Sequence, residues 1–219
     1  MSDLNINWVL ENFGDKKMNV FDIGCANVDG DAAMFKKLLP NAIVYAFECA
    51  EIWKEHNTKA AELHGINYFH MALSDKNDVV TFHPSASYNG EQWPYSGSVC
   101  KPRMTETSHG TFVWGDTYTV ESMKLDTFCD THNVTPDIIH IDVQGAEYKV
   151  LSNLSNYRPW AIWAEVNEFE NCYETNITHA AFIELLNSLG YTKLYSNNVD
   201  ELYVLNTLSL TPYYENKTP

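Results

Sequence analysis

The chain has 219 residues, 45% of them hydrophobic, and a formal net charge of −15 at pH 7. It is long enough to bury a sizeable core, it contains no apolar run of the roughly 18 residues that a membrane span needs, and its N-terminal stretch does not resemble a secretory signal. The acidic balance opposes non-specific nucleic-acid binding, which depends on Lys and Arg. We therefore expect one cytoplasmic domain over residues 1–219, with no membrane and no nucleic-acid partner.

The cysteines indicate a reducing environment. They are five in number, and none belongs to a CxxC pair. This pattern favours free thiols over a zinc site or a disulfide framework.

The first part of the chain alternates between apolar strands and helices. An amphipathic helix is predicted within residues 1–18. The strands and helices that follow are predicted at Val20–Ile23, Asp31–Leu39 (ended by Pro40), Ala42–Phe47, Ala50–His64 (capped by Gly65), Tyr68–Ala72 and Val79–His83.

Residues 84–117 have a different character. They are rich in Ser, Thr, Gly, Pro and aromatic residues and show no sustained periodicity. An irregular connection of this length is unusual unless it binds something, so we expect a substrate-facing insertion. Its aromatic residues either form a stacking wall for a sugar or an aromatic ring, or pack the insertion onto the domain; they are Trp93, Tyr95, Phe112, Trp114 and, just beyond it, Tyr118.

The second part of the chain continues the alternation and ends in a hairpin. The predicted elements are Tyr118–Met123, Lys124–His132, Ile138–Asp142, Ala146–Leu151, Trp160–Val166, Ala180–Leu189 (capped by Gly190), Thr192–Tyr195 and Glu201–Leu205. Strands that alternate with helices predict an α/β, doubly wound sheet, and the final hairpin predicts an antiparallel edge.

The segment IIHIDVQGAE places an acid at the end of a buried strand. Ligands of open α/β sheets bind outside the carboxyl ends of the strands, so Asp142 is our first candidate for a catalytic residue, either to position an acceptor or to act as a base. His140 lies on the same strand face and is a second candidate, and His109 is a third, from the insertion. The alternative interpretations are that Asp142 caps the next helix and that His140 is a packed core residue.

The end of the first strand predicts a nucleoside-type site. Gly24, Ala26 and Gly30 are small enough for a ligand to approach the backbone, and the acids Asp29 and Asp31 flank Gly30. These acids would repel phosphates and attract a cation, which favours the sulfonium and amino groups of S-adenosylmethionine over NAD. Alternatively, Asp22 and Asp31 cap the turn and helix.

Two further strand ends complete the predicted cofactor site. Glu48 ends the second strand and is placed to accept both ribose hydroxyls, unless it is a surface carboxylate. Ala72 and Leu73 would lie against the adenine, with Ser74 or Asp75 at its amino group. The full set of expected cofactor contacts is Asp22, Gly24, Cys25, Ala26, Asn27, Glu48, Cys49, Ala72, Leu73, Ser74 and Asp75.

Five segments, in chain order, carry a resemblance to a known family: VFDIG, AFE, ALSD, MKLDTF and IIHIDVQGAE. Over about residues 18–167 they resemble the FkbM-type methyltransferases. The resemblance implies S-adenosylmethionine as cofactor, O-methylation of a sugar or natural-product hydroxyl, and a Rossmann-like seven-stranded methyltransferase sheet with an antiparallel C-terminal hairpin. The chain departs from the family in its lengthened first loop, and in His140 and Gln144, where the family often has Lys and Glu.

Three alternatives stay open. Asp142 and Glu165, with Asn167, supply oxygen ligands that suit magnesium, as in metal-dependent O-methyltransferases. An NAD-dependent Rossmann oxidoreductase is disfavoured by the acidic first loop and the hairpin. A degenerate methyltransferase fold that serves as a binding scaffold is disfavoured by the presence of Glu48 and Asp142. We expect a small-molecule or glycan acceptor, and a homodimer is compatible with the sequence.

Overall fold

The structure is a computed structural model that describes residues 6–103, 106–107, 110–166, 172–175, 177–197 and 199–211. His109 and Asn167, both named above as candidate site residues, lie outside these residues.

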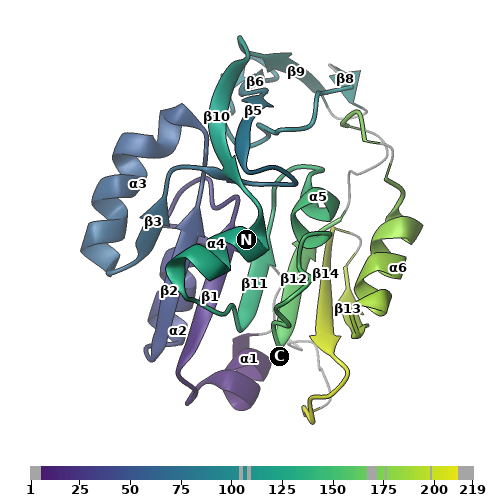
Figure 1. Cartoon of the computed structure of the whole chain (residues 1–219). Coiled ribbons are helices and arrows are strands. Elements are labelled where there is room, and N and C mark those ends of the chain that lie inside the picture. The colour runs from purple at the N-terminus through teal and green to yellow at the C-terminus, as the bar shows by residue number, and fades with distance from the viewer. Residues whose placement is uncertain are drawn as a thin grey trace, which may run out of the picture.

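A seven-stranded sheet forms the centre of the described chain (Figure 1), in the order β13-β14-β12-β11-β1-β2-β3. Its strands are β1 (Met18–Ile23), β2 (Ala42–Phe47), β3 (Asn67–Phe69), β11 (Ile138–Ile141), β12 (Ala161–Glu165), β13 (Tyr191–Ser196) and β14 (Asp200–Leu205). The first five are parallel, whereas β14 runs antiparallel to β12 and β13. This arrangement confirms the predicted sheet and its C-terminal hairpin.

Helices cover both faces of this sheet, because the buried residues of its parallel strands alternate between the faces. Phe21 and Ile23 pack with buried residues of α4 (Leu125–His132), α5 (Glu147–Leu151) and α6 (His179–Ser188). Val20 and Val44 pack on the other face with α1 (Ile6–Phe13), α2 (Asp31–Leu38) and α3 (Glu51–His64). Because these strands are parallel, their carboxyl ends lie together at one edge of the sheet.

The third strand is shorter than predicted. It ends at Phe69, where the amide of Met71 donates back to the Phe69 carbonyl at 3.0 Å and turns the chain away. Ala72–Leu73 forms β4, which pairs with β10 (Tyr118–Met123), and β10 also pairs with β5 (Asp78–Phe82). Placing Ala72 in the central sheet was therefore wrong, because it pairs in register with Ser122 of a second, three-stranded sheet.

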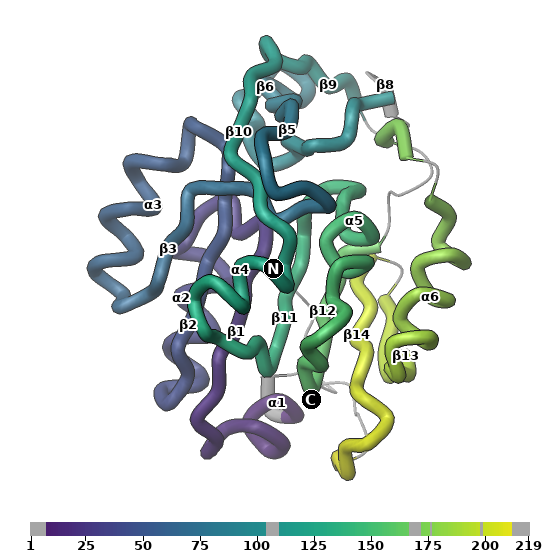
Figure 2. Tube along the Cα trace, viewed as in Figure 1, coloured from purple at the N-terminus to yellow at the C-terminus, as the bar shows by residue number. Residues whose placement is uncertain are grey.

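The span 84–117 is not irregular, which corrects the expectation from its composition. It contains a four-stranded sheet, here called the insertion sheet, in the order β7-β6-β9-β8. Its strands are β6 (Ser85–Tyr88), β7 (Glu91–Gln92), β8 (Glu106–Thr107) and β9 (Gly110–Trp114). Figures 1 and 2 show this sheet above the central sheet, and Figure 2 shows the chain returning through β10 to α4.

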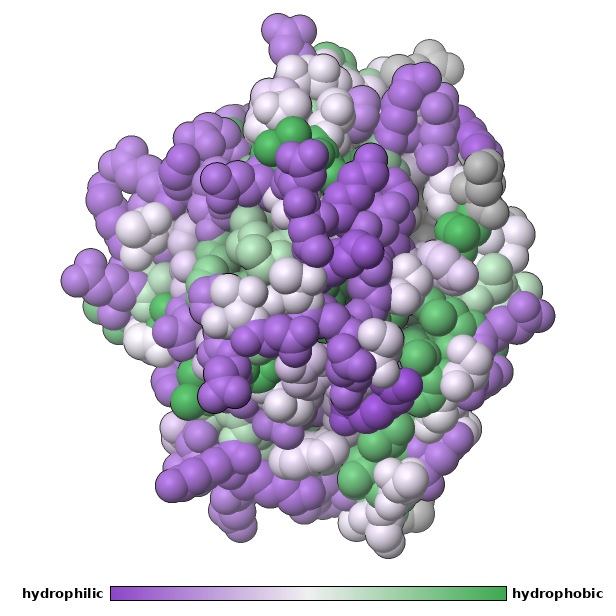
Figure 3. Space-filling model, viewed as in Figure 1, coloured by the Kyte–Doolittle hydropathy of each residue, from purple (hydrophilic) through white to green (hydrophobic). Residues whose placement is uncertain are grey.

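On the face shown in Figure 3 hydrophilic residues predominate, and hydrophobic residues emerge in groups between them, the most extended of these at the lower right. Within the described ranges, no helix combines the length and the apolar character that crossing a membrane requires.

Candidate active site

A cavity of about 320 Å³ lies at the carboxyl ends of the central strands. Segments that follow β1, β2 and β11 line it, and the segment 94–99 that follows the insertion strand β7 closes it from another side. The topology therefore brings together residues that are far apart in the sequence. The predicted site residues on its wall are Gly24, Cys25, Ala26, Asn27, Glu48, Cys49, Ala72, Leu73, His140 and Asp142.

Glu48 is held at this wall by two backbone amides. Its Oε2 accepts from the amide of Ala26 at 2.9 Å, and its Oε1 accepts from the amide of Ala50 at 2.6 Å. Burial raises the pKa of Glu48 to about 7, and these amide bonds work against that rise. Each carboxylate oxygen keeps a second lone pair. Glu48 is therefore preorganised to accept hydroxyl donors from the cavity.

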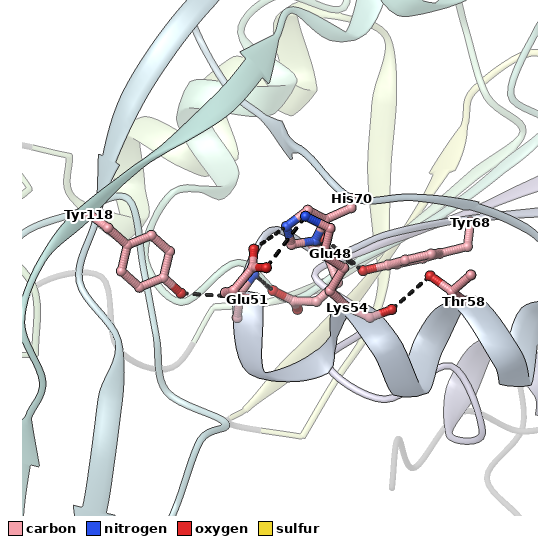
Figure 4. Close-up of polar contacts among 8 residues, drawn as sticks. Glu48, Glu51, Lys54, Thr58, Tyr68, His70 and Tyr118 are labelled. Atoms are coloured by element: carbon pink, nitrogen blue, oxygen red, sulfur yellow. Dashed lines mark hydrogen bonds and ion pairs between the residues drawn. The ribbon is translucent and has the colours of Figure 1, made fainter.

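The segment around Glu48 is fixed by a network of side chains (Figure 4). The Tyr68 hydroxyl contacts the Glu48 carbonyl at 3.2 Å and His70 Nδ1 at 3.2 Å. His70 Nε2 lies 3.0 Å from Glu51 Oε2, and the amide of Glu51 donates to the Tyr118 hydroxyl at 3.1 Å. The network joins β3, the start of α3 and β10, so the position of Glu48 depends on all three.

Gly24, on the cavity wall, also meets a packing requirement. It adopts φ +83°, and a Cβ there would lie 1.9 Å from the carbonyl oxygen of Asp142. Glycine is therefore required because the ends of β1 and β11 approach each other closely, whatever its contact with a ligand. Ala26 also has a positive φ, of 45°, and in that conformation its amide reaches Glu48.

His140 is a poor candidate for a base. Its Nδ1 lies 2.7 Å from Oδ1 of Asp22, a residue that is fully buried and is not on the cavity wall. Burial alone would lower the pKa of His140, but the Asp22 carboxylate and two further acids raise it to about 9. His140 is therefore engaged as the buried partner of Asp22 and is not a free base facing the cavity.

Asp142 is joined to Glu165 by a residue whose role the sequence did not indicate. The side-chain amide of Gln144 donates to Asp142 Oδ1 at 2.6 Å and to Glu165 Oε2 at 2.8 Å. Tyr173 lies with its hydroxyl 3.0 Å from Gln144 Oε1, an arrangement that orients the amide. Burial and the adjacent Asp142 raise the pKa of Glu165 well above its usual range.

Several predicted contacts lie elsewhere. Neither Ser74 nor Asp75 lines the cavity. Ser74 is buried elsewhere, and its hydroxyl donates to the exposed Asp75 at 3.0 Å. Wall residues that the sequence did not single out include Phe82, Ser98 and Val99. They come from β5 and from the insertion, and no motif could have placed them there.

The chemistry of the wall distinguishes between ligands. Asp31, Glu48 and Asp142 line the described cavity, and none of the lining residues is Lys or Arg. These acids favour the binding of a ligand with cationic and hydroxyl groups and disfavour the binding of a pyrophosphate. In the residues that the structure describes, no three His, Cys, Asp or Glu side chains are grouped to hold a metal ion, so the predicted magnesium site has no support.

Comparisons with known proteins agree with this geometry. A family model described as the methyltransferase FkbM domain matches residues 12–193. The chain is 29% identical over 191 residues to the 2-O-methyltransferase NoeI of Sinorhizobium fredii (strain NBRC 101917 / NGR234), covering 83% of this chain and 76% of that protein.

Two solved structures share the fold. A methyltransferase FkbM from Methylobacillus flagellatus KT matches with a TM-score of 0.50 and 11% identity, over 86% of this chain and 43% of that one. The chain thus spans less than half of that protein. A precorrin-6y C5,15-methyltransferase from Geobacter metallireducens GS-15 matches with a TM-score of 0.50 and 11% identity, over 92% and 86% of the two chains.

Proposed function

The chain belongs to the methyltransferase FkbM domain family, and on this basis we propose that it transfers a methyl group from S-adenosylmethionine to a hydroxyl of a sugar or natural product. One observation carries the proposal: Glu48 and Asp142, from the ends of two different parallel strands, face one cavity whose described wall has no Lys or Arg. The relative named 2-O-methyltransferase supports oxygen as the accepting atom.

The wall residues fit this cofactor. The free lone pairs of Glu48 would accept the ribose hydroxyls, and the acids Asp31 and Asp142 would favour its positive groups. When bound, S-adenosylmethionine supplies an electrophilic methyl group, so the protein needs no nucleophile of its own. Its tasks are to orient the acceptor, to exclude water and to remove one proton.

We assign proton removal to Asp142. The acceptor hydroxyl would donate to its carboxylate, and the proton would pass to Asp142 as the hydroxyl oxygen gains the methyl group. The side-chain amide of Gln144, which donates to both Asp142 and Glu165, holds Asp142 in place. A positioned general base typically contributes about 10²–10⁴-fold to rate.

Titration calorimetry with S-adenosylhomocysteine tests the cofactor assignment. We expect micromolar binding to the unchanged chain, a loss of at least tenfold in Glu48→Gln, and no change in Glu62→Gln, an exposed acid of α3. Asp142→Asn should keep this binding and lose methyl transfer to a panel of sugar acceptors, followed by mass spectrometry. Binding of NADH in place of S-adenosylhomocysteine would overturn the proposal.

A further inference from the structure

A row of aromatic rings leads out of the cavity. Tyr95 lines the cavity, and its ring centroid lies 5.3 Å from that of Trp53 and 5.1 Å from that of Trp93. The row continues from Trp93 to Tyr88 at 6.1 Å and from Tyr88 to Phe112 at 4.6 Å. It therefore connects the cavity with the insertion sheet.

Packing of the insertion onto the domain does not account for the whole row. Phe112 and Trp114 are partly buried, and Trp114 contacts Tyr173 at a centroid distance of 6.1 Å, so these two residues do pack the insertion. Trp93 and Tyr95 are 41% and 46% exposed, although they lie side by side. Adjacent large aromatic side chains left in water beside a cavity are typical of a ligand surface.

The backbone that carries these two rings is fixed. The Ser85 hydroxyl accepts from the amide of Ser96 at 3.0 Å and donates to the Trp93 carbonyl at 2.7 Å. The indole of Trp93 donates to Ser96 Oγ at 3.0 Å, and the indole of Trp53 donates to the Pro94 carbonyl at 3.3 Å. Both rings are thus preorganised, which reduces the entropy lost when a ligand binds.

The charge around the row selects the ligand. The adjoining cavity presents acids and, among its lining residues, neither Lys nor Arg, and the whole chain carries a formal charge of −15. A nucleotide sugar or a phosphorylated sugar would be repelled. A neutral sugar ring has an apolar C–H face that stacks on an aromatic ring while its hydroxyls remain in water. The row is therefore suited to neutral carbohydrate.

We propose that Trp93 and Tyr95 form a carbohydrate subsite outside the methyl-transfer cavity, and that this subsite holds the sugar unit next to the one that is methylated. The acceptor is then a neutral oligosaccharide of at least two units, not a free monosaccharide or a nucleotide sugar. The role of the subsite in methylation rests on the proposed function, but its affinity for carbohydrate does not.

A glycan array, followed by fluorescence titration of the glycans that bind, tests the subsite with the full chain. We expect binding to neutral oligosaccharides, a loss of at least tenfold in Trp93→Ala, and substantial recovery in Trp93→Phe. The control is Val113→Ala, an exposed apolar position on β9 of the insertion sheet, which should bind as the unchanged chain does. Absence of oligosaccharide binding, or equal binding by monosaccharides or by Trp93→Ala, would overturn the subsite.

Binding of S-adenosylhomocysteine to the same variants separates this proposal from the proposed function. Trp93 is not on the cavity wall, so Trp93→Ala should bind S-adenosylhomocysteine unchanged. If the chain binds oligosaccharide but not S-adenosylhomocysteine, the subsite stands and the proposed function fails. If it binds S-adenosylhomocysteine and methylates monosaccharides as well as oligosaccharides, the proposed function stands and the subsite fails.

Discussion

The side-chain amide of Gln144 donates to Asp142 Oδ1 at 2.6 Å, and its second hydrogen reaches Glu165 Oε2 at 2.8 Å. An amide nitrogen has two donors, whereas a carboxylate has only acceptors. A third acid at this position would face two others, whereas Gln144 supplies a donor to each.

We expect Gln144→Glu to impair catalysis. The new carboxylate replaces a donor by an acceptor between two acids, so Asp142 loses a hydrogen bond and is displaced. We expect kcat to fall at least tenfold at neutral pH, with a smaller change in the binding of S-adenosylhomocysteine. Steady-state methyl-transfer kinetics and calorimetry provide the two readings.

The control for this variant is Asn187→Asp, which makes the same change of amide to acid at an exposed position of α6. It should leave kcat unaltered. Unchanged kcat in Gln144→Glu would show that the amide bridge does not support Asp142.

The central sheet was predictable because its strands are continuous apolar runs, and β2 matches its predicted bounds of Ala42–Phe47. β4 was not, because a two-residue strand has no periodicity of its own and depends on the distant β10. The insertion sheet escaped prediction because Ser85, Ala86 and Ser87 lack the apolar alternation of a strand.

The site was predictable only in part, for a related reason. Asp142 and Glu48 follow buried strands, so the topology alone places them at one edge of the sheet. The bridge made by Gln144 depends on a left-handed backbone conformation, φ 55°, and on contact with Tyr173, neither of which local sequence specifies.

Cofactor binding should depend on pH through Glu48. Only the ionised carboxylate accepts both ribose hydroxyls, and burial raises its pKa to about 7. Affinity for S-adenosylhomocysteine should therefore rise about tenfold from pH 6 to pH 8, because the fraction of Glu48 that is ionised rises by this factor over the range. Calorimetry at a series of pH values measures this, and Glu48→Gln should give a flat profile. A profile in the unchanged chain that is equally flat would argue against contact between Glu48 and the ribose.

The stability of the unliganded protein should show the opposite dependence. Because the pKa of Glu48 rises from 4.5 to about 7 on folding, the folded state binds the extra proton between these values. The stability that this proton contributes is fully present below pH 4.5 and is lost as the pH rises through 7. Relative to Glu48→Gln, the unchanged chain should lose up to about 3 kcal/mol over this range in urea unfolding. A difference between the two proteins that does not vary with pH would contradict this expectation.

Gly24→Ala should be far more damaging than Gly65→Ala. Both glycines have positive φ values, 83° and 65°, so both variants incur the strain of about 1–2 kcal/mol that alanine has in this region. At Gly65 a new Cβ meets nothing within 4 Å, but at Gly24 it would lie 1.9 Å from the Asp142 carbonyl oxygen. We expect urea denaturation to show an additional loss of roughly 2 kcal/mol or more for Gly24→Ala. Equal losses in the two variants would mean that β1 and β11 can separate without penalty.

Tyr173→Phe should affect kcat more than binding. The hydroxyl of Tyr173 lies 3.0 Å from Gln144 Oε1 and 2.8 Å from the Ser96 carbonyl, in a side chain that is only 1% exposed. Without it, Gln144 Oε1 loses this contact, and the amide that donates to Asp142 and Glu165 is less firmly oriented. The loss of a buried hydrogen bond should destabilise the fold by about 1 kcal/mol, and loss of the amide orientation should lower kcat about tenfold. Tyr148→Phe, on α5, is the matched control and should keep kcat. If Tyr173→Phe loses stability without any change in kcat, Tyr173 contributes only to stability. The two acidic neighbours of Gln144 are then sufficient to orient its amide.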